Sequence, residues 1–466
     1  MRLPAVVPEL IVAAACLLLV ALAGWVRGRW RAAPAAATAA VLAAALAVTA
    51  ASLGAAPVPA FEGTYLVDAQ AQRFKLLILT AALIALALSA CHFRGRAAEA
   101  HAPAALLFAT LGALGLCSAV DLGLVLLFLQ ITSMASYVLV ALVRSDTHAL
   151  EAALKYFLFG AAALAVMAYG LTFLYGLTGS LDLRTIGVRL AEADRGWVAV
   201  ALVLALAGYG FKAALVPVHF WAPDALGTAA APVAGFLSVV PKLGAFAALA
   251  RFVVEALPPA AVDWPWLLAL LAAATMSYGN LAALRQQRLK RLLAYSTIAQ
   301  AGYLLTAVTV LTRAGGADDA LLFYLAAYLL MNLAAFAVAG SLELEGDRAA
   351  ALRGLSRRTP PLAAALAVAL LSLAGIPPLA GFAGKVLLLE AALDGGMAWL
   401  AIVAALNMLL ALVYYLRLVA WMYFQAPDTT IAAPRAIAGF AAAGLWVCVG
   451  GTLLLGLLPG VWLPSG

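Results

Sequence analysis

Long apolar stretches separated by short polar segments follow one another along the whole chain. A helix that crosses a bilayer needs ~20 mainly apolar residues, and on that basis the pattern predicts about fourteen membrane-spanning helices. The predicted helices centre near residues 17, 44, 82, 112, 132, 165, 206, 243, 273, 302, 330, 375, 410 and 447. No connecting segment is long enough to form an extramembrane domain. An all-α polytopic membrane protein is therefore expected.

Composition supports the same class. The 466 residues are 67% hydrophobic and 11% charged, and the mean hydropathy is +1.06, which excludes an ordinary soluble domain. The four cysteines are scattered and form no CxxC or Cys/His cluster, so no metal, haem or iron–sulfur site is predicted. The formal charge of +7 is best interpreted as loop asymmetry and not as affinity for nucleic acid.

The loops alternate between a basic set and a balanced set. The basic set contains Arg27, Arg29, Arg31, Arg94, Arg96, Arg144, Arg285, Arg288, Lys290, Arg291, Arg348, Arg353, Arg357, Arg358 and Arg435. The balanced set contains Arg73, Arg184, Arg189, Arg195 and Arg313 with Glu62, Asp68, Asp182, Asp194, Asp318 and Asp319. The positive-inside rule predicts that the basic loops are cytoplasmic and that both termini lie on the opposite side.

Three lysines lie deep inside apolar runs, where a charge costs at least ~2.5–3.5 kcal/mol on insertion scales. These runs are LAGYGFKAALVPVHF with Lys212, FLSVVPKLGAF with Lys242 and LAGIPPLAGFAGKVLLL with Lys385, and each contains proline. Proline interrupts or kinks a helix, and a membrane tolerates the break only inside protein or beside a wet cavity. Buried amines beside broken helices indicate an ion or proton path.

The proline-interrupted lysine segments occur five predicted spans apart, and an odd offset implies opposite orientation. Two inverted five-helix repeats are therefore predicted, each with a proline-broken helix, which is typical of transporters. The expected divisions are an N-terminal three-helix segment at 1–100, a first repeat at 103–256, a second repeat at 263–424 and a C-terminal helix at 430–466.

At these positions the chain resembles the antiporter-like subunit N family of proton-pumping NADH:quinone oxidoreductase, complex I. The matching stretches are EAALKYFLFGA, YGLTGSLDL, FKAALVPVHFWAPDA, PKLGAFA, LKRLLAYSTIAQAGY, AGIPPLAGFAGK and VYYLRLVAWMYF, which begin at residues 151, 175, 211, 241, 289, 374 and 413. The motifs FKxxxxPxHxWxPD and AGIPPxxGFxxK are shared with Mrp-type antiporter and membrane-hydrogenase subunits. KYFxxGA together with TGSLDL is more specific to subunit N.

The resemblance implies roles for individual residues. Lys212 corresponds to the central protonatable group, Lys242 to the link between two half-channels, and Lys385 to the exit on the opposite side. Lys155 corresponds to the lysine of the KYF motif, although its place near a span end also suits an amine that snorkels to the interface. His219 corresponds to the histidine after the broken seventh helix, where it relays protons or only caps the helix.

Two positions depart from the family pattern. Gln130 stands where the family has a glutamate that pairs with the central lysine, and Gln300 stands where a histidine is common. An amide keeps hydrogen bonding but cannot change charge in this way. A different carboxylate is therefore expected beside Lys212, and Glu151 or Asp146 is the nearest candidate in the sequence.

The resemblance implies a proton-translocating subunit of a multi-subunit NADH:quinone oxidoreductase, with other hydrophobic subunits and the lipid bilayer as partners and without nucleic acid. It implies no cofactor in this chain, because NADH and quinone are used elsewhere in the parent complex. The expected location is the bacterial inner (plasma) membrane. Two alternatives stay open: a pump-silent scaffold of the same complex, as Gln130 suggests, and a subunit of an Mrp-type antiporter or a membrane hydrogenase.

Overall fold

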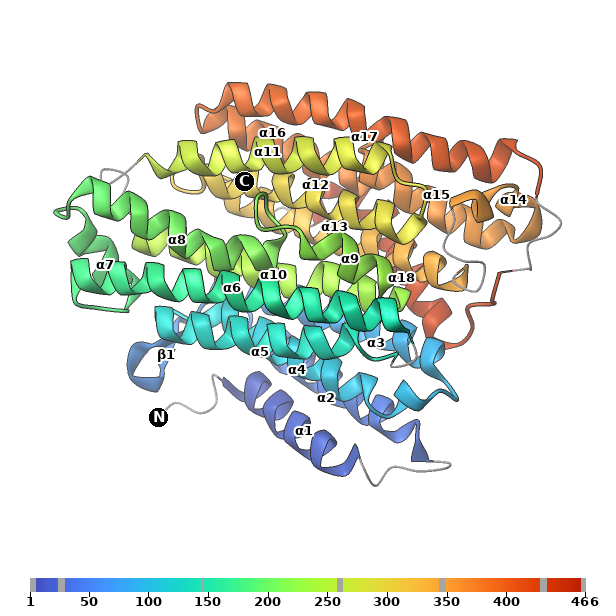
Figure 1. The fold of residues 1–466 in the computed structure, drawn as a ribbon, viewed down its shortest axis with the longest axis horizontal. Helices are drawn as coiled ribbons and strands as arrows, with labels where there is room; N and C mark the ends of the chain where they lie inside the picture. Colours follow the sequence, from blue (N-terminus) through green and yellow to red (C-terminus); the bar gives the residue numbers. More distant parts are fainter. Residues whose placement is uncertain are drawn as a thin grey trace. The chain divides into compact units, whose positions relative to one another are not determined.

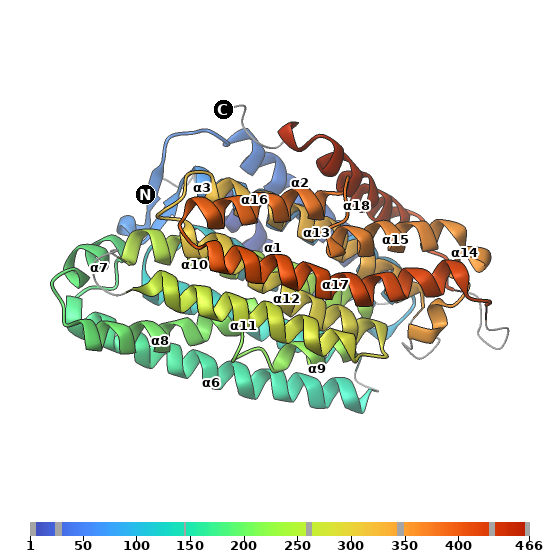
Figure 2. The same cartoon turned by 90° about the horizontal axis from the view of Figure 1, so that it is seen from above.

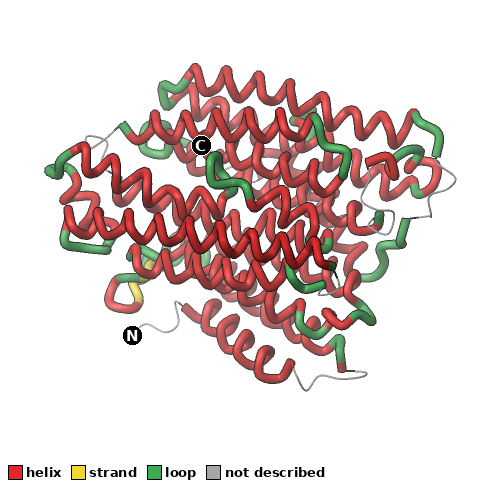
Figure 3. Tube along the Cα trace, in the orientation of Figure 1, coloured by secondary structure: helices red, strands yellow, loops and turns green. Residues whose placement is uncertain are grey.

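The computed structural model describes residues 6–23, 30–143, 146–257, 263–342, 349–427 and 434–461. Its first half contains α1 (Val7–Ala23), α2 (Ala33–Ala51), β1 (Val58–Ala60), β2 (Tyr65–Val67), α3 (Ala69–Phe93), α4 (Ala102–Ser118), α5 (Leu122–Val140), α6 (Thr147–Thr178), α7 (Leu183–Leu190) and α8 (Arg195–Ala213). It continues with α9 (Trp221–Thr228), α10 (Ala231–Ala256), α11 (Trp264–Leu284), α12 (Leu289–Val310), α13 (Ala317–Ser341), α14 (Leu355–Arg358), α15 (Pro360–Ala374), α16 (Ala380–Asp394), α17 (Ala398–Phe424) and α18 (Phe440–Leu457) (Figure 1). Helices dominate the trace, and one short antiparallel hairpin interrupts them (Figure 3).

The number of spans agrees with the sequence pattern. Among the described residues, eleven helices are long and apolar enough to cross a membrane, and three shorter apolar helices lie at Val7–Leu22, Ala102–Ser118 and Pro360–Ala374. Together they make the fourteen predicted spans. The all-α polytopic fold class is confirmed. Arg27, Arg29, Arg144, Arg348 and both ends of the chain lie outside the described residues, so their predicted sides are not addressed.

The chain forms two compact units that do not follow sequence order. Unit 1 contains residues 1–86, 93–221 and 240–267, and unit 2 contains residues 87–92, 222–239 and 268–466. In unit 1, α6 packs along α8, and α4 packs along α5. Small residues allow this close approach, because a Cβ on Gly170 would come within 2.6 Å of the Ala205 nitrogen.

In unit 2, α13 packs against α12, α15, α16 and α18. All but three of the 25 residues of α13 are buried, because other helices surround it and its sequence is apolar on all sides. α17 packs against α15, α16 and α12 and can be followed beside them in Figure 2. This arrangement surrounds the break between α15 and α16, and Lys385 lies in the second turn of α16.

Acids of the connecting loops mark where several helices begin. The side chains of Asp68, Asp121, Asp146, Asp182 and Asp194 accept main-chain N–H groups at the starts of α3, α5, α6, α7 and α8. The first N–H groups of a helix have no partner within the helix, and an aspartate at the N-cap satisfies them. Three acids of the balanced loop set therefore also serve as helix caps.

Both predicted helix breaks are present, and they share one backbone pattern. α8 is followed by Ala214 in the left-handed region at φ 61°, and α15 is followed by Gly375 at φ 89°. Three residues after each lies a proline with a cis peptide bond, Pro217 in one case and Pro378 in the other. Pro241 behaves differently from the expectation, because α10 continues through it as one helix. Neighbouring turns hold that helix together although one main-chain donor is missing.

Candidate functional site

Lys212 lies in the last turn of α8, and its side chain is turned into unit 1. Only 2% of the residue is exposed. Its Nζ donates to Ser133 Oγ at 3.1 Å, Ser136 Oγ at 3.3 Å and Tyr156 OH at 3.4 Å. Three hydroxyls, two from α5 and one from α6, therefore replace the water that a buried ammonium loses.

The break after α8 is tied to this site through Trp221. The Trp221 indole donates to the Phe211 carbonyl at 2.7 Å, near the end of α8. Its ring also stacks on Tyr156, with 4.2 Å between centroids. Tyr156 in turn bonds Lys212, so the conformation of the break and the position of the amine are coupled.

In the part of the chain that the structure describes, no acid forms an ion pair with Lys212. Gln130 on α5 is exposed, whereas Thr132 and Ser133 on that helix are buried. Glu151 pairs instead with Lys155 at 2.7 Å, and the two side chains are 58% and 46% exposed. Glu151 was the expected substitute partner. It bonds Lys155 instead, which lies one turn further along α6 and is also exposed.

Lys385 occupies the corresponding place in unit 2, with 1% of the residue exposed. Its Nζ donates to the Leu373 carbonyl at 2.8 Å and to the Ala374 carbonyl at 3.1 Å, which are the last two of α15. The end of a helix leaves carbonyls without partners and carries partial negative charge, so an ammonium is stabilised there. The Nζ also lies 4.7 Å from the centre of the Tyr303 ring, a cation–π distance.

Buried polar side chains of unit 2 form two hydrogen-bonded groups, and the second, the polar chain of unit 2, reaches Lys385. In the first group, Tyr328 OH donates to the Ser238 carbonyl at 3.0 Å, and Thr297 Oγ1 lies 3.2 Å from the same hydroxyl. One helical turn further on, Tyr324 donates to the amide oxygen of Gln300. The Gln300 nitrogen donates to the Leu373 carbonyl at 3.2 Å, which is the carbonyl that Lys385 also bonds. Gln300 therefore joins Tyr324 of α13 to the carbonyl that Lys385 bonds.

Lys242 is the third predicted amine, and it is 2% exposed on α10. Ser238 precedes it by one turn of the same helix and receives the Asn332 amide on its hydroxyl at 2.5 Å. Lys242 is thus buried one helical turn after Ser238, which bonds Tyr328 and Asn332 of α13. His219 is 3% exposed, and it lies in the connection after α8 with its ring 4.6 Å from that of Phe220.

A fourth buried lysine escaped the sequence interpretation. Lys75 on α3 is 1% exposed, and its Nζ lies 2.6 Å from Glu9 Oε1 on α1. Tyr65 OH donates to the same oxygen at 2.9 Å. The sequence did carry a signal, because Glu9 stands inside the apolar run VVPELIVAAA, where a lone carboxylate is costly without a cation.

Arg251 is a further buried cation that was not predicted, and only 1% of the residue is exposed. It pairs with Asp68 at 2.8 Å and with Glu255 at 2.7 Å, and Glu255 also lies 3.3 Å from Arg184. The network joins α3, α7 and α10 at one end of unit 1. The two acids balance the two arginines, so the buried guanidinium group of Arg251 is not left without a counter-charge.

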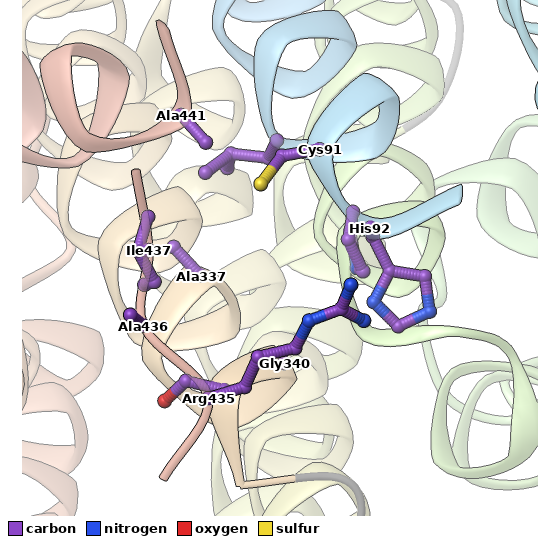
Figure 4. Close-up of a pocket in the computed structure, with 11 residues that line it drawn as sticks. Cys91, His92, Ala337, Gly340, Arg435, Ala436, Ile437 and Ala441 are labelled. Carbon is purple, nitrogen blue, oxygen red and sulfur yellow. The ribbon is translucent and has the colours of Figure 1, made fainter. Parts of the chain in front are cut away.

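A small pocket in unit 2 lies apart from the lysines. Figure 4 shows Arg435 pointing towards His92 beside Cys91, with Ala337, Ile437 and Ala441 around them. The Arg435 main chain is fixed by its N–H, which donates to the Ser341 carbonyl at 2.9 Å. None of the predicted site residues lines this pocket.

These features define a class: a polytopic antiporter-like membrane subunit in which lysines are buried beside interrupted helices. The chain belongs to the NADH:quinone oxidoreductase/Mrp antiporter membrane family, whose model matches residues 119–411. It is 40% identical over 464 residues to NADH-quinone oxidoreductase subunit N 1 of Streptomyces griseus, covering 98% of this chain and 96% of that protein. It is 38% identical to subunit N of Nitrosomonas europaea, covering 79% and 78%.

Solved structures agree with this assignment. A chain of respiratory complex I from Thermus thermophilus with bound aureothin matches with a TM-score of 0.84 and 39% identity, over 98% of this chain and 99% of that one. A chain of the Mrp complex from Dietzia sp. matches with a TM-score of 0.87 at 24% identity, over 99% and 96%. The second likeness shows the shared fold alone. The sequence relatives therefore place this chain with subunit N within the family.

Proposed function

We propose that this chain translocates protons across the membrane as a subunit of an NADH:quinone oxidoreductase. The observation that carries the proposal is that Lys212 and Lys385 are both buried beside interrupted helices, and that the polar chain of unit 2 reaches the carbonyl that Lys385 bonds. An ionisable group at membrane depth is costly, and hydrogen-bonded side chains that lead to it are typical of proton relays. The relatives named subunit N of this oxidoreductase support the same role.

In this proposal the lysines work by acid–base chemistry, without covalent intermediates. Lys212 accepts and releases a proton among three hydroxyls, each of which can both donate and accept. Lys242 passes protons along α10 towards Ser238, and Lys385 releases them at the end of α15. His219 remains a candidate member of the relay beside the first break.

The hydroxyl surroundings of Lys212 set this subunit apart from a mechanism that rests on a carboxylate–ammonium pair. Rotation of a serine or tyrosine hydroxyl changes whether the amine meets a donor or an acceptor. The break after α8 is coupled to Tyr156 through Trp221, so a movement of the break shifts one of these partners. We propose that this coupling takes the place of the missing charge pair.

Redox chemistry is assigned to other subunits, so NADH and quinone act in the parent complex and this chain binds neither. The proposed location is the bacterial inner membrane, with both termini on the non-cytoplasmic side, and the proposed partners are other membrane subunits of the complex. A pump-silent scaffold is the second candidate function. It is favoured because Lys212 meets hydroxyls, and no carboxylate, among the described residues.

Substitution of the buried lysines tests the proposal. Lys212→Met and Lys385→Met are made in the full complex, with Lys155→Met as the matched control because Lys155 is half exposed. NADH-driven proton uptake by inverted vesicles is measured against NADH oxidation and against the amount of assembled complex. The two buried variants should lose pumping while assembly persists, because removing a buried charge does not hinder insertion. Normal pumping in both would support the scaffold role instead.

A further inference from the structure

Four arginines of unit 2 converge on one open hollow of about 1030 Å³. Arg285 and Arg288 come from the connection between α11 and α12, Arg353 follows the short 3-10 turn Ala349–Leu352, and Arg417 lies on α17. Trp421, one turn beyond Arg417, completes the wall. None of these residues belongs to the lysine relay.

The hollow is a built arrangement. Arg417 donates through Nη1 to the Leu284 carbonyl at 3.1 Å and through Nη2 to the Gln286 carbonyl at 3.3 Å. The Trp421 ring centre lies 5.7 Å from the Arg417 guanidinium and 5.8 Å from that of Arg353. Main-chain carbonyls and an indole thus hold two of the guanidinium groups before any ligand arrives.

The positive charge of the hollow is not balanced by its own lining, which includes no carboxylate among the described residues. The nearby basic residues are directed elsewhere, because Lys290 donates to the Ala229 carbonyl at 3.0 Å and Arg291 lies 3.6 Å from Asp224. Lys290 and Arg291 therefore contact residues in or next to α9, whereas Arg285 and Arg288 line the hollow. Clustered guanidinium groups match phosphate oxygens in geometry and charge.

An apolar wall continues from the hollow along α17. Leu406, Leu409, Val413 and Leu416 are 57%, 64%, 59% and 40% exposed, and their spacing places them on one side of the helix. From Leu406 to Leu416 the helix rises about 15 Å, which is the depth of one leaflet of a ~30 Å hydrocarbon core. A phosphate in the hollow and acyl chains on this wall fit a single lipid molecule.

We infer that this hollow binds the phosphate of an anionic phospholipid, whose acyl chains lie along α17. The positive-inside rule assigns its arginines to the cytoplasmic leaflet. A lipid explains the indole beside the guanidinium groups, since tryptophan is enriched at the membrane interface. It also explains why the charged hollow and the exposed apolar wall are continuous, which an acidic protein segment would not require.

The test uses the purified complex in detergent with phosphatidylglycerol as the anionic probe and phosphatidylcholine as the neutral one. Bound lipid is counted by native mass spectrometry for the unmodified complex, for Arg285→Gln/Arg288→Gln and for Arg353→Gln. Arg94→Gln is the matched control, because Arg94 is an exposed arginine of the same loop set that does not line the hollow. Arg417 is left intact because it also supports the end of α11.

The unmodified complex and the Arg94 variant should retain phosphatidylglycerol in preference to phosphatidylcholine. The double variant should bind it about a hundredfold more weakly and the Arg353 variant about tenfold more weakly, since each lost charge-assisted contact is worth about a factor of ten in affinity. Unchanged phosphatidylglycerol binding in both hollow variants would overturn the inference. Inorganic phosphate that displaces the lipid at equal concentration would identify a free-phosphate site instead, and loss of a protein subunit in place of lipid would identify a protein contact.

Discussion

Replacement of Gln300 by leucine should interrupt the polar chain of unit 2 without removing any lysine. Gln300 is fully buried; it accepts from Tyr324 and donates to the Leu373 carbonyl at 3.2 Å. Leucine has a similar volume and neither group. Leu373 keeps Lys385 as a donor, so the main unsatisfied group is the Tyr324 hydroxyl, at a cost of about 1–3 kcal/mol.

That cost is small enough for a large membrane subunit to assemble, whereas the loss of the link should strongly lower the number of protons pumped per NADH oxidised. The assay compares proton uptake by inverted vesicles with NADH oxidation at matched complex content. Gln72→Leu is the control, because Gln72 is also buried, at 3% exposure, but bonds Ser52 in unit 1. Gln300→His should retain pumping, since an imidazole both donates and accepts.

Two outcomes would refute this reasoning. Full pumping by an assembled Gln300→Leu complex would show that the amide only packs α12 against its neighbours. An equal loss of pumping in Gln72→Leu would show that any buried amide acts through stability, so that the position next to Leu373 has no special part.

Two further predictions follow from the ion pairs. Glu151→Gln should leave pumping unchanged, because its ion pair with Lys155 is exposed to solvent and contributes little, and it lies away from Lys212. A marked loss would return Glu151 to the relay. Lys75→Met should lower the amount of assembled complex, because it leaves the largely buried Glu9 carboxylate without its cation, which costs ~3–5 kcal/mol of stability. The double variant Lys75→Met/Glu9→Gln removes that charge as well and should restore assembly. Immunoblots of native gels measure assembly, and a double variant as poor as the single one would contradict the assignment.

The class of the protein and the positions of its helices could be predicted from the sequence, because both depend on local properties. Apolar length and hydropathy are additive along the chain, so fourteen spans and their centres follow without knowledge of packing. The helix breaks at Pro217 and Pro377–Pro378 are equally local, since proline acts on the turn that contains it. Pro241 is the exception, because the surrounding turns of α10 keep that helix continuous.

The partners of each charge were decided only by tertiary structure. Gln130 and Ser133 are three residues apart on α5, yet only Ser133 bonds Lys212, because the rotation of α5 in the bundle selects which face meets α8. Glu9 and Lys75 are 66 positions apart, and the hydrophobic pattern of their two helices does not show that these residues pair. A charge in an apolar run shows from the sequence that a partner must exist, but helix packing alone determines which residue provides it.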